Sequence, residues 1–548
     1  MIWLKRTVPL ITILIFMSPF LAGRPAGAQT ATPTPAPQML DHRFGAVESF
    51  WAAEEAADLG VGWERILFYW NEIQPFGPDS WNTLHVMEEW LHEANAHNRT
   101  VLGVLKNTPS WATDSPYASG VPYGLYLPDD DPDNLWANYV RRVVEYYAPL
   151  GVHNWIIWNE PEIAPGVYGH EFSGTMADYY QLKKVAYRVI KAHDPQGVVH
   201  LGGITYWHDP TFLDRYLAMV AADPTAPDHD YYFDVISLHI YFRPETVPLI
   251  LESAFTAQEA AGISPAKPVW INETNARPSM DPEWPVEVEL FQIDLDQQAW
   301  YIIQAFSLGF AAGAERISVY KLVDVNLPPG GESWGLIRPH DFSKRPAYYA
   351  YHTLIRQTAG FIPPVRQQQG DLYQLVTFER PQGLTRVLWA RGQAPVSVTL
   401  PATAASASLV SALGEVQTIL AEEGVYRLEL AGARCYGECY MGGPPVFVVE
   451  PEISSAPPPT ATAVPSTTAT VTPAPGIAAS PEPTMMATAV ASPLPSATPW
   501  PVVAEEMDVD TFVDTAVDTW PGPLTGLYVL LVGLLLGSGL LFIWRRRA

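Results

Sequence analysis

Short apolar runs that alternate with longer amphipathic stretches are the feature that most limits the fold of this sequence. Between residues 40 and 360, eight runs rich in β-branched and aromatic residues are separated by helix-like segments. The runs occupy residues 44–48, 64–69, 100–106, 154–160, 198–204, 233–241, 268–273 and 316–322. Strands that alternate with helices predict a parallel sheet, and eight such units fit an α/β fold, a (β/α)8 TIM barrel over 40–360. A doubly wound open sheet is the alternative fold.

The segment that follows, residues 361–451, has a different pattern. Several short apolar runs with turns between them predict a small all-β sandwich. Trp389 is the only Trp of this segment, so a structural role is favoured over ligand binding on aromatic rings. Cys435 and Cys439 are the only cysteines of the chain, and they are close enough in sequence to form a small disulfide in an oxidising exterior.

The two ends of the chain predict export and a membrane anchor. Residues 1–28 combine a basic start, an apolar stretch and a small-residue cleavage site, as secretory signal peptides do. Residues 524–544 form an apolar run long enough to span a bilayer, followed by an arginine-rich tail, 545–548, that is expected to stay in the cytoplasm. The segments 29–39 and 452–523 are rich in Pro and Thr, which predicts a linker and a disordered stalk. We therefore expect a monomeric ectodomain held at the cell surface by one C-terminal transmembrane helix.

The overall charge and the scarcity of metal-binding residues exclude several classes of function. A formal net charge of -26 argues against a nucleic-acid partner, because phosphate contacts require Lys and Arg. The histidines are scattered and there are only two cysteines, so neither a metal site nor a cofactor is expected. The acidic stretch 127–134 lacks the spacing of a calcium-binding loop and predicts a solvated surface loop.

Two glutamates stand at the ends of predicted barrel strands. Glu160 ends the fourth run and is followed by Pro161, which cannot continue a strand ladder, while Glu273 ends the seventh run. Functional groups of such barrels lie at the carboxyl ends of the strands, where strands four and seven face each other across the mouth. Glycoside hydrolysis requires two facing carboxyl groups, one protonated to assist the leaving oxygen and one ionised. The alternative is that both are ordinary acids at the rim.

The segments WIIWNEPE and VWINETN resemble the catalytic motifs of the clan A glycoside hydrolases, which are retaining enzymes on a TIM barrel. The resemblance covers nearly all of residues 40–360. Within the clan, the sequence is similar to families five and thirty-nine. It implies that Glu160 is the acid/base, that Glu273 is the nucleophile, and that Asn159 hydrogen-bonds the sugar 2-hydroxyl. Asn272 before Glu273 and Thr274 after it depart from the better-known families.

Further positions match the same resemblance. Arg65 corresponds to an arginine that supports the nucleophile, and a cation there would keep Glu273 ionised. His239 and Tyr241 correspond to a His-x-Tyr pattern whose Tyr donates to the nucleophile, and strand alternation places both on one face. The alternatives are a structural salt bridge for the arginine and an ordinary rim position for the histidine. We also expect a dry position to keep Glu160 protonated.

Aromatic residues near the strand ends are candidates for sugar contacts. Trp111 is a candidate sugar platform after the third strand, with a loop-anchoring role as its alternative. The same resemblance implies an aromatic residue after the eighth strand that floors the reactive subsite, and Trp334 or Tyr320 is the candidate. The loops 107–134 and 323–344 are expected to decide which carbohydrate fits.

Together these features predict a retaining β-glycosidase at the cell surface that acts on a β-linked poly- or oligosaccharide without a cofactor. Two alternatives stay open at this stage. One is a non-catalytic carbohydrate receptor on a retired glycosidase barrel. The other is a transglycosylase that uses the same site.

Overall fold

The computed structural model of this protein describes residues 40–284, 286, 291–324 and 333–451. The predicted signal peptide, both Pro/Thr-rich segments, the predicted transmembrane helix and the basic tail lie outside these residues, as does part of the 323–344 loop. Within the described part of the chain, no helix is both long enough and apolar enough to cross a membrane.

A curled sheet of parallel strands forms the centre of the first part of the chain. In the described residues it has nine strands in the order β5-β4-β3-β2-β1-β9-β8-β7-β6. The strands are β1 (Asp41–Val47), β2 (Val61–Tyr69), β3 (Thr100–Lys106), β4 (Asn154–Ile157), β5 (Val198–His200), β6 (Ile204–Thr205), β7 (Ile236–Tyr241), β8 (Val269–Asn275) and β9 (Arg316–Val319).

The two strands at the ends of this order, β5 and β6, are consecutive in the chain and are separated only by residues 201–203. Parallel backbone bridges join Asn159 to Gly203 and His200 to Val235, so the fifth predicted run touches neighbours on both sides. In a doubly wound open sheet the edge strands would be distant segments. The curled sheet therefore fits an α/β barrel, in which the run at 198–204 is broken into two short strands.

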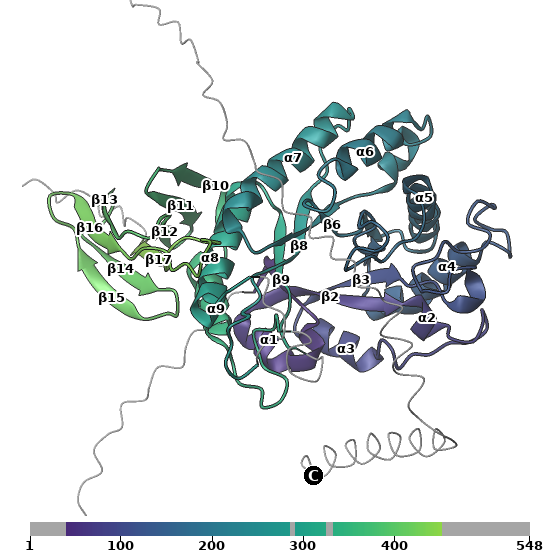
Figure 1. Cartoon of the computed structure of the whole chain (residues 1–548), viewed down its shortest axis with the longest axis horizontal. Coiled ribbons are helices and arrows are strands. Elements are labelled where there is room, and N and C mark those ends of the chain that lie inside the picture. Colours follow the sequence, from purple (N-terminus) through teal and green to yellow (C-terminus); the bar gives the residue numbers. More distant parts are fainter. Residues whose placement is uncertain (1–39, 285, 287–290, 325–332, 452–548) are drawn as a thin grey trace, which may run out of the picture. The chain divides into compact units, whose positions relative to one another are not determined.

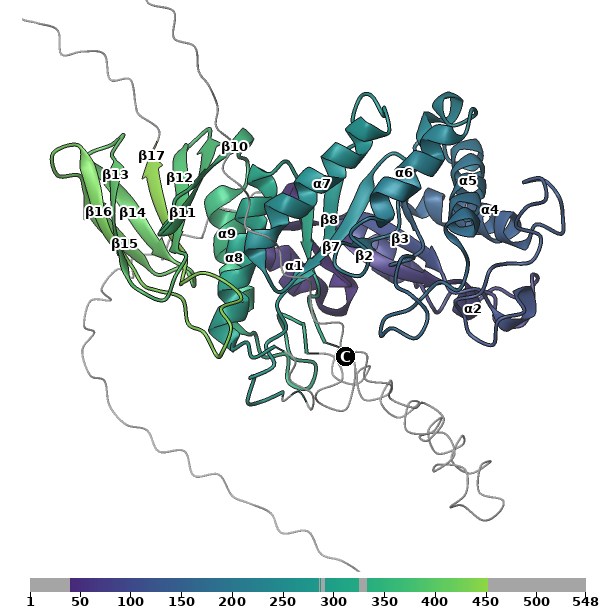
Figure 2. The same cartoon turned by 45° about the horizontal axis from the view of Figure 1, so that its top comes forward.

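Helices cover the outside of the sheet in Figures 1 and 2. They are α1 (Ala53–Leu59), α2 (Trp70–Ile73), α3 (Glu88–Ala96), α4 (Leu135–Tyr147), α5 (Met176–His193), α6 (Phe212–Ala222), α7 (Val247–Ala260), α8 (Leu295–Ala311) and α9 (Pro346–Thr358). Local sequence sets where the longest helices begin. Thr175 and Asp178 form a reciprocal capping box at the start of α5, and Asp294 and Gln297 form another at the start of α8.

Large side chains fill the inside of the curled sheet. Trp63 and Trp270 lie with their ring centroids 5.5 Å apart, and they belong to a buried cluster separate from the core beneath the helices. A side chain at Gly45 would meet the Trp63 ring at 2.3 Å, so glycine is required at this position of β1. The filled interior leaves the carboxyl ends of the strands as the place where polar groups gather.

The second part of the chain is a β domain made of two antiparallel sheets. Within the described residues, one sheet has six strands in the order β10-β11-β12-β17-β14-β15, and the other pairs β13 with β16. Side chains from both sheets share one buried cluster. The strands are β10 (Ile362–Gln369), β11 (Tyr373–Arg380), β12 (Gly383–Ala390), β13 (Val396–Pro401), β14 (Ser406–Ser411), β15 (Val416–Leu420), β16 (Val425–Leu430) and β17 (Val446–Pro451).

Trp389 of the β domain is fully buried and therefore does not present its ring to a ligand. Cys435 and Cys439 are joined in a disulfide. The domain lies beside α8 and α9, as Figure 1 shows, and Gln304 of α8 connects the two. Its side chain donates to the Gly443 carbonyl at 2.9 Å and accepts from the Gly442 N–H at 3.0 Å. A buried side chain that completes both hydrogen bonds fixes the β domain on the barrel.

Candidate active site

Glu160 lies at the mouth of the barrel, three residues beyond the end of β4. The predicted continuation of the strand to residue 160 is wrong, because the ladder ends at Ile157 and the chain then turns sharply. Trp158 and Glu160 have φ values of 68° and 43°, which side chains other than glycine rarely adopt. The Glu160 N–H donates to the Gly203 carbonyl at 3.0 Å. Strain of this kind persists where surrounding contacts impose it, and functional sites are a common location.

Glu273 is held by two donors from other strands. Arg65, in β2, is almost completely buried and donates through Nη1 to Glu273 Oε1 at 2.6 Å. The Tyr241 hydroxyl, from β7, donates to Glu273 Oε2. Arg65 also donates through Nη2 to Asn159 Oδ1 at 2.5 Å. One guanidinium therefore connects the two predicted catalytic strand ends, and its planar fork suits this double contact.

His239 stands between the two carboxyl groups. Its Nδ1 lies 2.6 Å from Glu160 Oε1 and 3.5 Å from Glu273 Oε2. One atom from each of the three side chains falls within 4.8 Å of the other two. The structure thus brings together six of the eight residues predicted to bind or react: Glu160, Glu273, Asn159, Arg65, His239 and Tyr241.

The charges around Glu160 overturn one expectation. Burial acts to raise the pKa of Glu160, but the hydrogen bond and charge of His239, with Arg65 and Lys106, outweigh burial and lower this pKa. For His239, burial acts to lower the pKa, but the charge of Glu273 and the contact with Glu160 raise it above its ordinary value. The prediction that a dry position keeps Glu160 protonated is therefore wrong for the free protein.

The side chains of Glu160, His239 and Glu273 lie close enough together to be considered as ligands of one metal ion. However, both oxygens of Glu273 are already engaged, one by the Arg65 guanidinium and one by the Tyr241 hydroxyl. A metal ion at this position would compete with a fixed positive charge at hydrogen-bonding distance. Hydrogen bonds and ion pairs account for the arrangement, and we assign no metal to it.

An aromatic wall adjoins Glu273. The ring of Trp334 lies 5.0 Å from the ring of Tyr241, and the ring of Tyr320 lies 6.2 Å from both. The Asn275 side chain, from the end of β8, donates to the carbonyls of Tyr320 at 2.6 Å and Trp334 at 2.7 Å. Both candidates for the floor of the reactive subsite are therefore present beside the predicted nucleophile.

The position of Trp334 is fixed by buried charges. Asp324 accepts from the Trp334 N–H at 2.8 Å, and its other oxygen accepts from Arg345 Nη1 at 2.7 Å. Arg345 also donates to Asp281 at 2.8 Å, and all three charged groups are buried. These contacts join the loops after β8 and β9, so the aromatic wall rests on a rigid ion network.

Trp111 is held by contacts with the chain that follows β2. Its Nε1 donates to the Gln74 carbonyl at 2.8 Å, and its ring packs edge-on against Trp70 at 5.8 Å. A ring held in this way anchors the loop after β3 to the loop after β2. These contacts are those expected of a loop anchor, and the ring remains partly exposed, so its role as a sugar platform stays a prediction.

Lys106 and Glu171 belong to the site but were not predicted. Lys106 is the last residue of β3, is almost completely buried, and forms an ion pair with Glu171 from the loop after β4. The sequence did contain a signal for Lys106, because a charged residue that ends an apolar strand lies at the same barrel end as Glu160. Nothing in the sequence marks Glu171, which comes from a loop.

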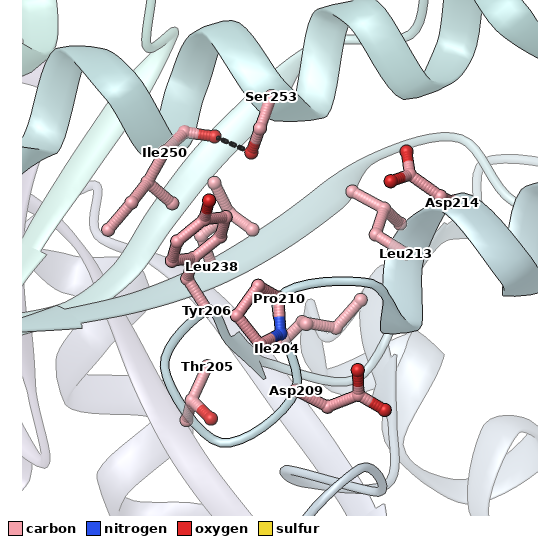
Figure 3. Close-up of a pocket in the computed structure, with 10 residues that line it drawn as sticks. All are labelled: Ile204, Thr205, Tyr206, Asp209, Pro210, Leu213, Asp214, Leu238, Ile250 and Ser253. Carbon is pink, nitrogen blue, oxygen red and sulfur yellow. Dashed lines mark hydrogen bonds between the residues drawn. The ribbon is translucent and has the colours of Figure 1, made fainter. Parts of the chain in front are cut away.

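A small pocket lies apart from these residues, between α6 and α7. Leu238, Leu213 and Ile250 contribute apolar surface to it, as Figure 3 shows, and the Ser253 hydroxyl at its edge donates to the Ile250 carbonyl at 2.8 Å. None of the eight predicted site residues lines this pocket. It is therefore a separate feature of the helix layer.

An α/β barrel with two facing carboxyl groups at the carboxyl ends of its strands is the class that the fold and the site define. The sequence matches no protein-family model and no curated protein. Among solved structures, a family 39 glycoside hydrolase from the gut symbiont Bacteroides cellulosilyticus WH2 is similar, with a TM-score of 0.57, 15% identity, and coverage of 75% of this chain and 81% of its own. A monomeric beta-xylosidase from Caulobacter crescentus CB15 gives a TM-score of 0.52, 14% identity, and coverage of 75% and 96%. At these identities the likeness establishes the fold.

Proposed function

We propose that this protein is a retaining glycoside hydrolase that cleaves O-glycosidic bonds in a β-linked poly- or oligosaccharide, on an eight-unit (β/α)8 barrel. The observation that carries the proposal is the approach of Glu160 and Glu273, whose nearest side-chain oxygens lie within 4.8 Å with His239 between them. Retaining enzymes hold their two carboxyl groups about 5 Å apart, whereas inverting enzymes leave roughly 6.5–9.5 Å for a water molecule. Asn159 would then contact the sugar 2-hydroxyl.

In the first step, Glu273 attacks the anomeric carbon while the glycosidic C–O bond breaks. Arg65 and Tyr241 orient the Glu273 carboxylate, and the Glu160–His239 pair supplies the proton that the leaving oxygen takes up. In the second step, a water molecule loses a proton to Glu160 and attacks the same carbon. The bond to Glu273 then breaks, and the sugar leaves with its original anomeric configuration.

The proposal is tested with the full-length protein on aryl β-glycosides and on β-glucan, xylan and mannan. Glu273→Ala with added azide is expected to give a glycosyl azide of inverted configuration, because azide enters where the nucleophile stood. Glu160→Ala with azide is expected to give the retained configuration, because azide attacks the glycosyl-enzyme. Glu54→Ala changes an exposed residue of α1 and is the control. It should hydrolyse the substrates as the parent does, with or without azide.

Three results would contradict the proposal. Hydrolysis with inversion of configuration would show that Glu273 is not a nucleophile. A parent protein that binds one of the polysaccharides but cleaves none, with Glu273→Gln binding equally well, would favour the non-catalytic receptor. Formation of longer oligosaccharides in place of reducing sugars would identify a transglycosylase on the same two carboxyl groups.

We also propose that the protein is exported and anchored at the cell surface. The support comes from the sequence, in which residues 1–28 have the pattern of a signal peptide and residues 524–544 have the length and composition of a transmembrane segment. Cell fractionation and protease treatment of intact cells test this proposal. The full-length chain is expected in the membrane fraction and accessible from outside, while a chain ending at residue 523 should be released.

A further inference from the structure

The two oxygens of the Glu160 carboxyl group face different surroundings. Oε1 is bonded to His239, whereas Oε2 makes no hydrogen bond to the residues that the structure describes. A side chain at Gly169 would stand 3.9 Å from Oε2 and 3.2 Å from the Ile163 side chain. The absence of a side chain at Gly169 thus leaves open the space next to the oxygen that is free to transfer a proton.

The loop that carries Gly169 is fastened at several points. Its Glu171 carbonyl accepts from the Trp158 indole N–H at 2.8 Å, and the Glu171 side chain pairs with Lys106. The Ser173 N–H donates to the Ser119 carbonyl at 2.9 Å, which joins this loop to the loop after β3. The segment beside Glu160 is therefore held in place from both the barrel side and the neighbouring loop.

The tip of this fastened loop presents apolar surface to solvent. Tyr168, next to Gly169, is 100% exposed, and Val167 is 41% exposed. A tyrosine with its whole surface in water contributes no core packing, so the ring that adjoins Gly169 in sequence is available to a ligand, and tyrosine is among the residues enriched at binding hot spots. An aromatic ring presents a flat apolar face, and a pyranose ring carries C–H groups on its own faces.

We propose that Tyr168 and Gly169 form the subsite for the leaving-group sugar, with the Tyr168 ring as a stacking platform and Gly169 as the opening beside Glu160. This proposal rests on the function proposed above. It adds that the loop binds the sugar on the leaving-group side of the cleaved bond. The occupant is the sugar ring that Glu160 Oε2 protonates as it departs. The subsite would therefore favour oligosaccharides over substrates with small leaving groups.

The test compares leaving groups that do and do not fill this subsite. Full-length parent, Tyr168→Ala and Tyr168→Phe are assayed on β-glucosyl, β-xylosyl and β-mannosyl fluorides and on the corresponding β-1,4-linked trisaccharides. A glycosyl fluoride has no sugar ring to place in the leaving-group subsite. Tyr168→Ala is expected to lose about tenfold in kcat/KM on the trisaccharide, the scale for losing an aromatic anchor, and to stay within about twofold of the parent on the fluoride. Tyr168→Phe, which keeps the ring, should resemble the parent on both.

Tyr349→Ala is the matched control, because Tyr349 is 48% exposed on α9, outside the barrel mouth. An equal rate for Tyr168→Ala and the parent on the trisaccharide, with fluoride turnover intact, would overturn the subsite and leave the proposed function standing. An equal loss on trisaccharide and fluoride would overturn it too, because the effect would then not depend on the leaving group. A parent that turns over none of the fluorides or trisaccharides would overturn both proposals.

Discussion

The Glu162→Gln substitution is expected to stabilise the protein above pH 7 and to change its stability little near pH 4.5. Glu162 is buried, and its Oε1 accepts from the backbone N–H and the hydroxyl of Thr205. Its Oε2 is also buried and has no partner within the described part of the chain. Glutamine keeps the accepting oxygen and places an uncharged amide where the unpaired carboxylate oxygen lies, which costs less than a buried charge.

The magnitude follows from the pKa of this group. Burial raises the pKa of Glu162 from 4.5 to about 7, against the hydrogen bonds from Thr205. Between these two values the folded protein binds a proton that the unfolded chain has released, so the free energy of unfolding falls as the pH rises. At about 1.4 kcal/mol for each pH unit, the whole window corresponds to about 3 kcal/mol. The glutamine side chain does not titrate, so the variant does not lose this stability as the pH rises. Its free energy of unfolding should therefore exceed that of the parent by close to zero at pH 4.5 and by about 3 kcal/mol above pH 7.

The assay is urea unfolding of the parent and the variant at pH 4.5 and pH 8, and the quantity compared is the difference between the two proteins at each pH. Other titrating groups are common to both proteins and cancel in that difference. A difference of the same size at both pH values, or a variant less stable than the parent at pH 8, would refute the reasoning.

Glu64→Gln provides the contrast. Burial also raises the pKa of Glu64 to about 7, but its two oxygens accept from Arg99 Nε at 3.1 Å and from the Phe50 N–H at 3.0 Å. The NH2 group of a glutamine at this position would face one of these two donors and could not accept its hydrogen bond. The substitution also removes the negative charge that pairs with the buried Arg99. Glu64→Gln is therefore expected to destabilise the protein by about 3 kcal/mol at pH 8, where the carboxylate is ionised.

Three further substitutions test the site and its support. Arg65→Met removes a cation that donates to Glu273 and is expected to lower kcat/KM on an aryl β-glycoside by about a hundredfold or more; a value within tenfold of the parent would contradict its role. Tyr241→Phe removes one donor to the same carboxylate and should cost about tenfold to a hundredfold in the same assay, with the thermal midpoint unchanged. Arg345→Met leaves Asp324 buried without its cation and is expected to cost about 3–5 kcal/mol in thermal unfolding; an unchanged midpoint would show that the ion network does not support the fold.

Much of the fold could be predicted from the sequence because strand position depends mainly on local apolar runs. Each of the eight predicted barrel runs overlaps a strand of the curled sheet. The break between β5 and β6 was not predictable, since a side chain at Gly203 would meet His239 Nε2 at 1.9 Å and this contact joins distant segments. In the β domain, Pro363 and Pro364 argue against a strand at β10, but β10 lies at the edge of its sheet, where proline is tolerated.

The candidate site was predictable to the extent that its residues end strands. Glu273 and Tyr241 lie at strand ends, where the barrel topology alone brings side chains together. Trp111 was judged from its position after a strand, yet its hydrogen bond to Gln74 depends on the path of two loops. Glu171 comes from a loop for the same reason, and no periodic pattern in the sequence fixes where a loop folds back.

The proton balance between Glu160 and His239 explains how a carboxyl group with a lowered pKa can serve as an acid. The pair holds one proton in either of two forms, with a charged imidazolium beside a carboxylate or a neutral imidazole beside a carboxylic acid. The charged form requires a proton on His239 Nε2, which is buried without a partner among the described residues and packs against Gly203. Such an orphaned donor costs about 1–3 kcal/mol, which reduces the preference of the pair for the charged form. A sugar that excludes water from the exposed Oε2 removes solvation from the carboxylate alone, and this shifts the proton to the oxygen that faces the leaving group.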